Sequence, residues 1–215
     1  MGANFCPLCS SNLIVDYSRD FLRHYHECQD CHLVFVPRSE LISPDEEKTR
    51  YDAHENSSED QGYMTYLQNV YACLRPFLDP AWQGLDFGCG RSKVFYNIAA
   101  KENILIDSYD LFYHPLQNIW NKKYDFIILS EVIEHLRDPQ DVLKRLRSIL
   151  KMDGLLFVKT KLLPTSKIEF DNWFYKRDKT HIQFFNISSF EKLSDLFDLQ
   201  LVQILGPDLF LFRAK

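Results

Sequence analysis

The chain has 215 residues, of which 46% are hydrophobic and 26% charged, and its formal net charge is −5. This length suits one medium-sized domain with a small appendage, and the composition is that of a globular protein. The mildly acidic balance argues against broad nucleic-acid binding, which usually rests on clustered lysine and arginine. We see no secretory leader and no apolar run of membrane-spanning length, so we expect a cytoplasmic protein without a membrane partner.

The first unit, residues 1–38, contains two CxxC pairs, Cys6 with Cys9 and Cys28 with Cys31. This spacing predicts a closed tetrahedral Zn²⁺ site with four cysteine ligands inside a small zinc ribbon. Because four thiolates leave no coordination position open, the ion would be structural. Two disulfides are disfavoured by the expected compartment, and a redox CxxC normally stands alone beside a βαβ unit.

Residues 39–80 are expected to form a polar linker or lid and then a helix. Ser43 and Pro44 fit the N-cap and the first position of a short helix. From residue 63 to 78 apolar side chains recur at helical spacing, which predicts a helix packed on the sheet that follows.

The stretch at residues 85–92 is predicted to be a strand, a glycine turn and the start of a helix. Gly88 and Gly90 allow a sharp turn and a close approach by a ligand. Asp86 at the strand end can orient the turn or accept a hydrogen bond from a cationic ligand. Taken alone, such a turn is weak evidence of function.

The next predicted strand ends at Asp110, about twenty residues after the glycines, where a carboxylate can hold a ribose diol. A dinucleotide site would normally carry a third glycine at the position of Lys93. The lysine side chain would crowd a pyrophosphate, so a dehydrogenase is disfavoured.

Residues 124–129 predict a strand buried on both faces, and polar side chains follow it where ligands bind in open α/β sheets. The stretches 85–92 and 124–139 together resemble class I S-adenosylmethionine-dependent methyltransferases, whose cofactor has no phosphate. The resemblance implies an α/β, Rossmann-like seven-stranded sheet over residues 81–215, parallel with an antiparallel terminal hairpin. It also implies S-adenosylmethionine as methyl donor and S-adenosylhomocysteine as product.

The resemblance and the sheet-edge argument give nine candidate cofactor-binding residues: Tyr51, Asp86, Gly88, Cys89, Gly90, Asp110, Leu111, Ser130 and Glu131. Tyr51 would close over the methionine end, as tyrosines do in similar methyltransferases, or would only anchor a solvated loop, and His54 and Asn56 lie beside it. Residues 111–123 are too few for a full third strand with its helices, so that strand should be short or degenerate. We expect Leu111 either to contact the adenine of the cofactor or to pack in the core.

Methyl transfer chiefly requires the nucleophile, methyl group and sulfur to be held in line, and a hydroxyl or amine acceptor may also need a base. His135 and His181 are the candidate bases, each with a purely structural alternative. The long segment before His181 is rich in aromatic residues that would line a substrate pocket.

Three functions remain open. A small-molecule methyl acceptor is favoured by the aromatic segment and the acidic balance. An RNA or protein acceptor gripped by the ribbon is the alternative, since the Cys-Pro-Leu-Cys opening resembles ribosomal-RNA guanine methyltransferases, but the expected basic patch is missing. The third possibility is a non-catalytic scaffold that only binds the cofactor.

Overall fold

The computed structural model describes residues 5–53 and 60–215. The strands of the described chain are β1 (Ile14–Arg19), β2 (His24–Cys28), β3 (Val34–Phe35), β4 (Gln83–Phe87), β5 (Leu105–Tyr109), β6 (Tyr124–Ser130), β7 (Leu150–Lys159), β8 (Gln183–Phe184), β9 (Leu199–Leu205) and β10 (Leu209–Ala214). The α-helices are α1 (Pro44–Ala53), α2 (Gln61–Leu74), α3 (Val94–Ala100), α4 (Pro139–Ile149), α5 (Lys167–Asn172) and α6 (Ile187–Leu196).

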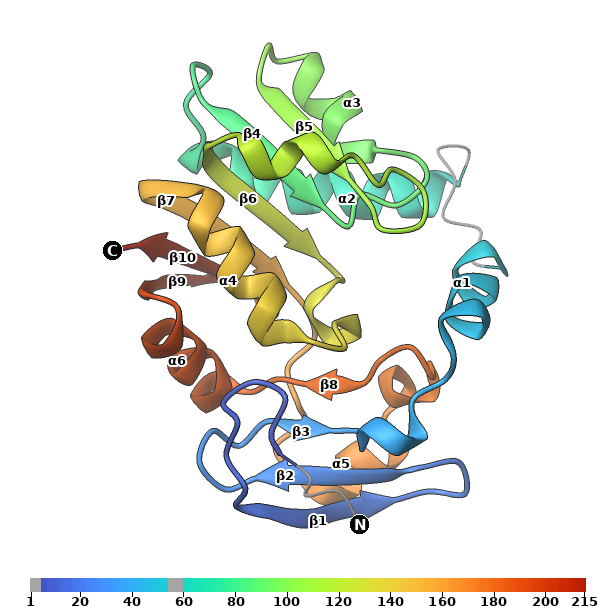
Figure 1. The fold of residues 1–215 in the computed structure, drawn as a ribbon. Helices are drawn as coiled ribbons and strands as arrows, with labels where there is room; N and C mark the ends of the chain where they lie inside the picture. Colours follow the sequence, from blue (N-terminus) through green and yellow to red (C-terminus); the bar gives the residue numbers. More distant parts are fainter. Residues whose placement is uncertain (1–4, 54–59) are drawn as a thin grey trace.

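The central sheet of the described residues has six strands in the order β5-β4-β6-β7-β10-β9 (Figure 1). Strands β5, β4, β6 and β7 are parallel, and β10 pairs antiparallel with both β7 and β9. The α/β class and the antiparallel terminal hairpin are therefore confirmed, whereas the count of seven strands is wrong. A turn and the 3-10 helix Gln117–Asn121 take the place of a third parallel strand, in the segment that is too short to hold one.

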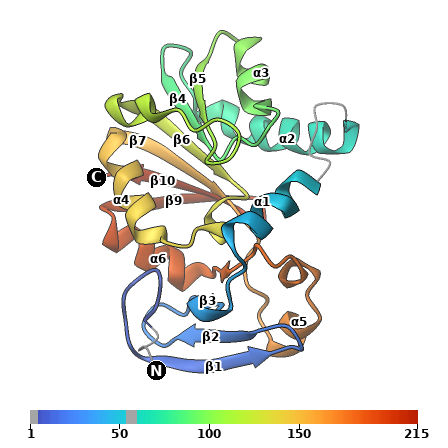
Figure 2. The same ribbon diagram turned by 45° about the vertical axis from the view of Figure 1, so that its right-hand side comes forward.

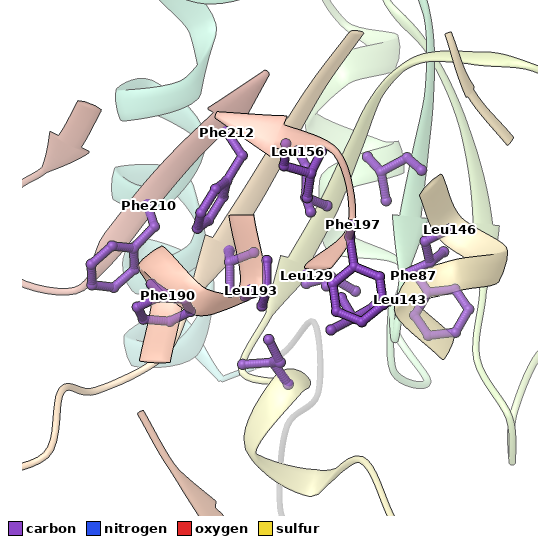
Figure 3. Close-up of a cluster of buried hydrophobic side chains, with 14 of the residues drawn as sticks. Phe87, Leu129, Leu143, Leu146, Leu156, Phe190, Leu193, Phe197, Phe210 and Phe212 are labelled. Atoms are coloured by element: carbon purple, nitrogen blue, oxygen red, sulfur yellow. The ribbon is translucent and has the colours of Figure 1, made fainter. Parts of the chain in front are cut away.

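Helices cover both faces of this sheet, which explains the continuous apolar run of β6. Phe126 and Ile128 pack with α2 and α3, while Ile127 and Leu129 pack with α4 and α6. Figure 3 shows the second of these layers, where Leu143 and Leu146 of α4 and Phe190 and Leu193 of α6 meet the sheet. Because the side chains in both layers are apolar, the polar groups that follow β4, β5 and β6 lie at the carboxyl edge of the sheet.

The amino-terminal ribbon continues into the rest of the molecule. Its sheet has the order β1-β2-β3-β8, so that β8 from the second half of the chain completes it. Leu8, Leu33 and Phe35 are fully or almost fully buried in the same apolar cluster as Phe185 and Phe190. The ribbon is thus packed on the rest of the molecule over an apolar contact, and the predicted unit boundary at residue 38 stays a prediction.

Helix α1 is attached differently, because it buries none of its side chains. Glu47 forms an ion pair with Arg137 at 2.8 Å and Asp52 one with Arg91 at 2.7 Å. The Ser43 hydroxyl accepts from Glu46 N at 3.2 Å, as expected of an N-cap. Figure 2 shows α1 between the ribbon and α2. Polar contacts therefore hold this helix over the carboxyl edge of the sheet.

None of the helices in the described ranges combines the length and the apolar character needed to cross a bilayer.

Candidate active site

The glycine turn after β4 has the backbone that its sequence predicts. Gly88 has φ 84° and Gly90 has φ 63°, both in the left-handed region. A Cβ at Gly88 would lie 2.4 Å from Val132 Cγ2, so glycine is needed for the loop after β6 to come close. A Cβ at Gly90 would meet no atom within 4 Å. The turn is therefore closed on the side of β6 and open at Gly90, while Cys89 between the two glycines is buried.

Asp86 lies beside this turn at the end of β4 and is only 2% exposed. Its Oδ2 atom is buried without a hydrogen-bond partner. Burial, with a smaller contribution from the charge of Asp110, raises the pKa of Asp86 to about 8. An unpaired buried carboxyl group is costly, and a cationic ligand would relieve that cost. The chemistry of this position fits the positively charged S-adenosylmethionine.

Asp110 links the glycine turn to the turn after β5. Its Oδ2 accepts from Gly90 N at 3.0 Å, and its Oδ1 accepts from the backbone N–H groups of Phe112 and Tyr113 at 2.9 and 3.1 Å. A carboxylate has about four acceptor sites, so about one remains for a ligand hydroxyl. Leu111, in the same turn, is exposed, so it is not a core residue.

Tyr51 of α1 reaches across two loops at the carboxyl edge. Its ring centroid lies 5.6 Å from that of Phe112 and 5.6 Å from that of His135, and its hydroxyl donates to Glu47. The structure therefore brings this tyrosine together with the residues that follow β5 and β6. His54 and Asn56 lie outside the described residues.

Ser130 and Glu131 end β6 and begin the loop behind Gly88. Ser130 Oγ is buried without a partner. Glu131 Oε1 accepts from Tyr66 OH at 2.7 Å and lies 3.7 Å from Lys159 Nζ, while Oε2 accepts from Tyr175 OH at 2.9 Å. Burial opposes ionisation here, but these hydrogen bonds and the lysine lower the pKa of Glu131 overall. Its carboxylate is thus the centre of a protein network.

Glu134, His135 and His181 come together on the other side of this network. The His135 and His181 ring centroids are 4.7 Å apart. Glu134 is fully buried; its Oε1 accepts from Tyr175 OH and its Oε2 has no partner. Burial, followed by the charge of Glu131, raises the pKa of Glu134 well above its usual value.

The two histidines share one hydrogen-bonding pattern. His135 Nδ1 lies 2.9 Å from Thr180 O, and His181 Nδ1 lies 2.7 Å from Tyr175 O. A carbonyl oxygen only accepts, so each Nδ1 carries the proton and each Nε2 has a lone pair. Burial lowers the pKa of His135 to about 3 and also lowers that of His181. Both rings are neutral at pH 7, and His135 is too weak a base for efficient proton removal.

The aromatic segment before His181 only partly faces the site. Phe170 is fully buried against Tyr17, Tyr25 and Phe184, so it fills the contact with the ribbon and cannot line an open pocket. Tyr175 instead joins the acidic network. Sequence reasoning missed this role and that of Tyr66, because Tyr66 lies on a helix read only for its apolar stripe.

The four ribbon cysteines lie close enough to share one ion. Cys6 Sγ is 3.6 Å from Cys31 Sγ, Cys9 Sγ is 3.5 Å from Cys28 Sγ, and all four thiols are free. Tetrahedral zinc with bonds of about 2.3 Å requires sulfur atoms about 3.8 Å apart, so the cluster fits Zn²⁺ with little movement. The hydrogen bond between Cys6 and Cys31 lowers the pKa of Cys6 and raises that of Cys31, and burial raises that of Cys9, so binding of a metal ion must release protons from the cluster.

Comparison with known proteins identifies the family. Residues 58–204 match the family model described as a methyltransferase domain, which is more than half of the chain. No curated protein matches the chain significantly.

Solved structures share the fold at low sequence identity. LaPhzM is 13% identical with a TM-score of 0.52, and 80% of this chain matches 59% of that one. The methyltransferase CalO1 of calicheamicin biosynthesis, solved with S-adenosylhomocysteine, is 12% identical with a TM-score of 0.50, and 71% of this chain matches 55% of that one. A possible histamine N-methyltransferase from Thermotoga maritima is 17% identical with a TM-score of 0.47, over 71% of this chain and 89% of that one. The chain belongs to the methyltransferase domain family and is a class I S-adenosylmethionine-dependent methyltransferase.

Proposed function

We propose that this protein transfers the methyl group of S-adenosylmethionine to a small-molecule acceptor and releases S-adenosylhomocysteine. The observation that carries the proposal is the set of four carboxyl groups at the carboxyl ends of β4, β5 and β6, namely Asp86, Asp110, Glu131 and Glu134. Burial raises the pKa of Asp86 and Glu134, so this edge gains its full negative charge when a cationic methyl donor binds and displaces their protons. A polyanionic nucleic acid is not attracted to such an edge.

For the donor, we propose one role for each group of residues. The Asp86 carboxylate accepts from the donor's ammonium group, and the remaining acceptor site of Asp110 takes a ribose hydroxyl. Gly88, Cys89 and Gly90 provide the backbone beside the donor. Leu111 and Ser130 contact the adenine, Tyr51 closes over the methionine end, and Glu131 borders the methyl group.

For the reaction, the protein mainly has to position the partners. S-adenosylmethionine supplies an activated methyl group on a good leaving group, and correct alignment accounts for much of the rate. Tyr66 and Tyr175 fix Glu131 through their hydroxyl groups, so the acceptor side has a defined shape. His135 and His181 border the same side as candidate proton acceptors, and burial lowers the pKa of both imidazoles.

We also propose that Cys6, Cys9, Cys28 and Cys31 bind a structural Zn²⁺. The spacing of their sulfur atoms supports this, and so does the absence of a disulfide among the described cysteines. Free cysteines in this arrangement persist in a reducing compartment, which supports a cytoplasmic location.

A macromolecular acceptor is the second candidate, and one feature of the ribbon favours it. Phe21, between β1 and β2, is 93% exposed, and the neighbouring Leu22 is also exposed. Exposed apolar side chains at a hairpin tip are a possible contact for an RNA or protein substrate. A scaffold that binds the cofactor without turnover is the third candidate.

The test uses S-adenosylmethionine labelled in its methyl group and an extract separated beforehand into RNA, protein and small-molecule fractions. We expect the label to enter the small-molecule fraction with the wild-type protein and not with Asp110→Ala. Label in acid-precipitable RNA or protein would support the second candidate, in which case Phe21→Ser should reduce it. Donor binding without any transfer would support the scaffold.

A further inference from the structure

Three metal-ligand side chains converge from two separate segments of the chain. Glu134 and His135 belong to the 3-10 turn Ile133–His135 after β6, and His181 precedes β8. One ligand atom of each lies within 4.8 Å of the others. This cluster is separate from the four cysteines, and no motif spacing in the sequence announces it.

Both imidazoles are already oriented in the way that metal-ligating histidines are. Each donates its Nδ1 proton to a backbone carbonyl, Thr180 O for His135 and Tyr175 O for His181. Such a bond fixes the tautomer and directs the Nε2 lone pair towards an ion. The two rings are tilted by 56° to each other, and one nitrogen of each lies within 4.8 Å of the other.

The burial of Glu134 is a separate observation that points to a ligand at this place. Glu134 is 0% exposed, and its Oε2 has no hydrogen-bond partner. Tyr175 OH occupies only the other oxygen. A buried carboxyl oxygen without a partner costs free energy, and a bound cation would remove that cost.

We propose that Glu134 Oε2, His135 Nε2 and His181 Nε2 bind one divalent first-row transition ion. Two imidazoles and one carboxylate suit ions such as Mn²⁺, Fe²⁺ and Zn²⁺, and three protein ligands leave coordination positions open. Glu131 is not one of the three ligands, because its oxygens already contact Tyr66, Tyr175 and Lys159. The cysteine cluster, in contrast, is closed.

The catalytic role of this ion rests on the proposed function. A hydroxyl group of the acceptor occupies an open position, and the ion lowers its pKa so that the proton passes to water. The resulting oxygen anion attacks the methyl carbon, the new C–O bond forms, and the C–S bond breaks with its electron pair going to sulfur. The preferred acceptor therefore carries a hydroxyl beside a second oxygen, which together chelate the ion. With the ion bound, His135 and His181 act as ligands, which replaces the proton-acceptor role considered for them without an ion.

The test measures the ion directly on the zinc-loaded full chain. Free Mn²⁺ is followed by electron paramagnetic resonance during a titration, because Mn²⁺ prefers imidazole and carboxylate over the thiolates of the ribbon. We expect one Mn²⁺ per chain, and water-proton relaxation should report exchangeable water on the bound ion. His181→Ala and the isosteric Glu134→Gln should weaken binding by at least the ten- to hundredfold that loss of an outer-shell partner typically costs.

The control is Glu102→Gln, an exposed carboxylate that pairs with Arg75. It should bind Mn²⁺ as the wild type does. No Mn²⁺ binding by the wild type, or equal binding by the wild type and both site variants, would overturn the proposal. Calorimetric titration with S-adenosylmethionine shows whether the variants are folded. If the wild type binds Mn²⁺ but not S-adenosylmethionine, the proposed function fails while the metal site stands.

Discussion

The two clusters of side chains that can bind a metal ion are built in opposite ways. The four cysteines come from two local CxxC pairs, enclose their site completely and belong to a ribbon of short strands. Glu134, His135 and His181 come from two loops at the carboxyl edge of the large sheet, and the two histidines are only half-buried. A closed thiolate shell holds structure, and an open site of nitrogen and oxygen donors is suited to chemistry.

A short chain of hydrogen bonds connects the clusters. Val36 N, at the end of the ribbon, donates to Ile182 O at 2.9 Å, and Ile182 N donates to Glu134 O at 2.9 Å. In addition, β3 pairs with β8 through Val34 with Phe184. The ribbon thus holds the segment that carries His181, so the cysteine cluster supports the position of the second cluster.

The largest expected effect follows from removing the zinc. A strong chelator, or Cys28→Ser, should lower the melting temperature and also displace His181, because structural zinc contributes about 10–16 kcal/mol in zinc-finger peptides. Histidine NMR signals and thermal melts would measure both changes. Cys73→Ser, which alters an exposed cysteine, is the control. Unchanged His181 signals after loss of the metal would show that the two clusters are independent.

The next largest effect concerns the affinity for S-adenosylmethionine at the carboxyl edge of the sheet. Asp86→Asn removes the carboxyl group that we assign to the donor's ammonium group and that becomes negatively charged when the donor binds. A hydrogen bond to a charged group contributes about 1.5–3 kcal/mol, so the Kd for S-adenosylmethionine should rise about ten- to a hundredfold. Calorimetry checks this, with the exposed Asp195→Asn as control. Equal affinities for the two variants would remove Asp86 from the binding site.

The affinity for the donor should also depend on pH. Because burial raises the pKa of Asp86 to about 8, its folded form is mostly protonated at pH 7, and binding a cation must release that proton. The Kd should fall by up to about tenfold per pH unit between pH 6 and 8, then level off. Asp86→Asn should flatten the profile; a profile that is flat in the wild type contradicts the assignment.

The same group sets the sign of a stability effect. A carboxyl group whose pKa rises on folding stabilises the folded state fully below its unfolded pKa near 3.8, and this contribution is lost as the pH rises towards about 8. Relative to Asp86→Asn, the ligand-free wild type should therefore lose stability between pH 5 and 8. Denaturant melts at several pH values measure the difference, and parallel curves would contradict it.

A smaller effect is expected from Tyr175→Phe. The hydroxyl lies within hydrogen-bond distance of both Glu131 and Glu134 and shares its single proton between them, so its loss should disturb the open cluster at a cost of about 1–3 kcal/mol. Tyr66→Phe, which loses only the bond to Glu131, should disturb it less. Mn²⁺ affinity ranks the two variants. If Tyr66→Phe weakens Mn²⁺ binding more than Tyr175→Phe does, the hydrogen bond to Glu131 matters more than the one to Glu134, which contradicts this ranking.

The smallest effect should come from α1. Asp52→Asn breaks an exposed pair with Arg91 and a hydrogen bond from Tyr113, and exposed ion pairs contribute little. The melting temperature should stay nearly constant. If α1 moves to admit and release S-adenosylmethionine, the same variant should raise the association and dissociation rates, which stopped-flow binding would measure. Unchanged rates would show that α1 does not move during binding.

Local sequence patterns predicted the parts of this fold that depend on near neighbours. The turn at Gly88 and Gly90, the apolar strand β6 and the spacing of the four cysteines all have short-range causes, and all three are present. The completion of the ribbon by β8 was missed, since pairing between Val34 and Phe184 depends on the whole chain. The contact between His135 and His181, and the role of Tyr175, are long-range for the same reason.

The most direct measurement is a calorimetric titration of the zinc-loaded wild type with S-adenosylmethionine, repeated with Asp110→Ala. Asp110 fixes the glycine turn through Gly90 N and offers its remaining acceptor site to the ribose. We expect one molecule bound per wild-type chain and at least about tenfold weaker binding by the variant. Failure of the folded wild type to bind S-adenosylmethionine, or equal affinity of the variant, would contradict the assignment of this edge as the donor site.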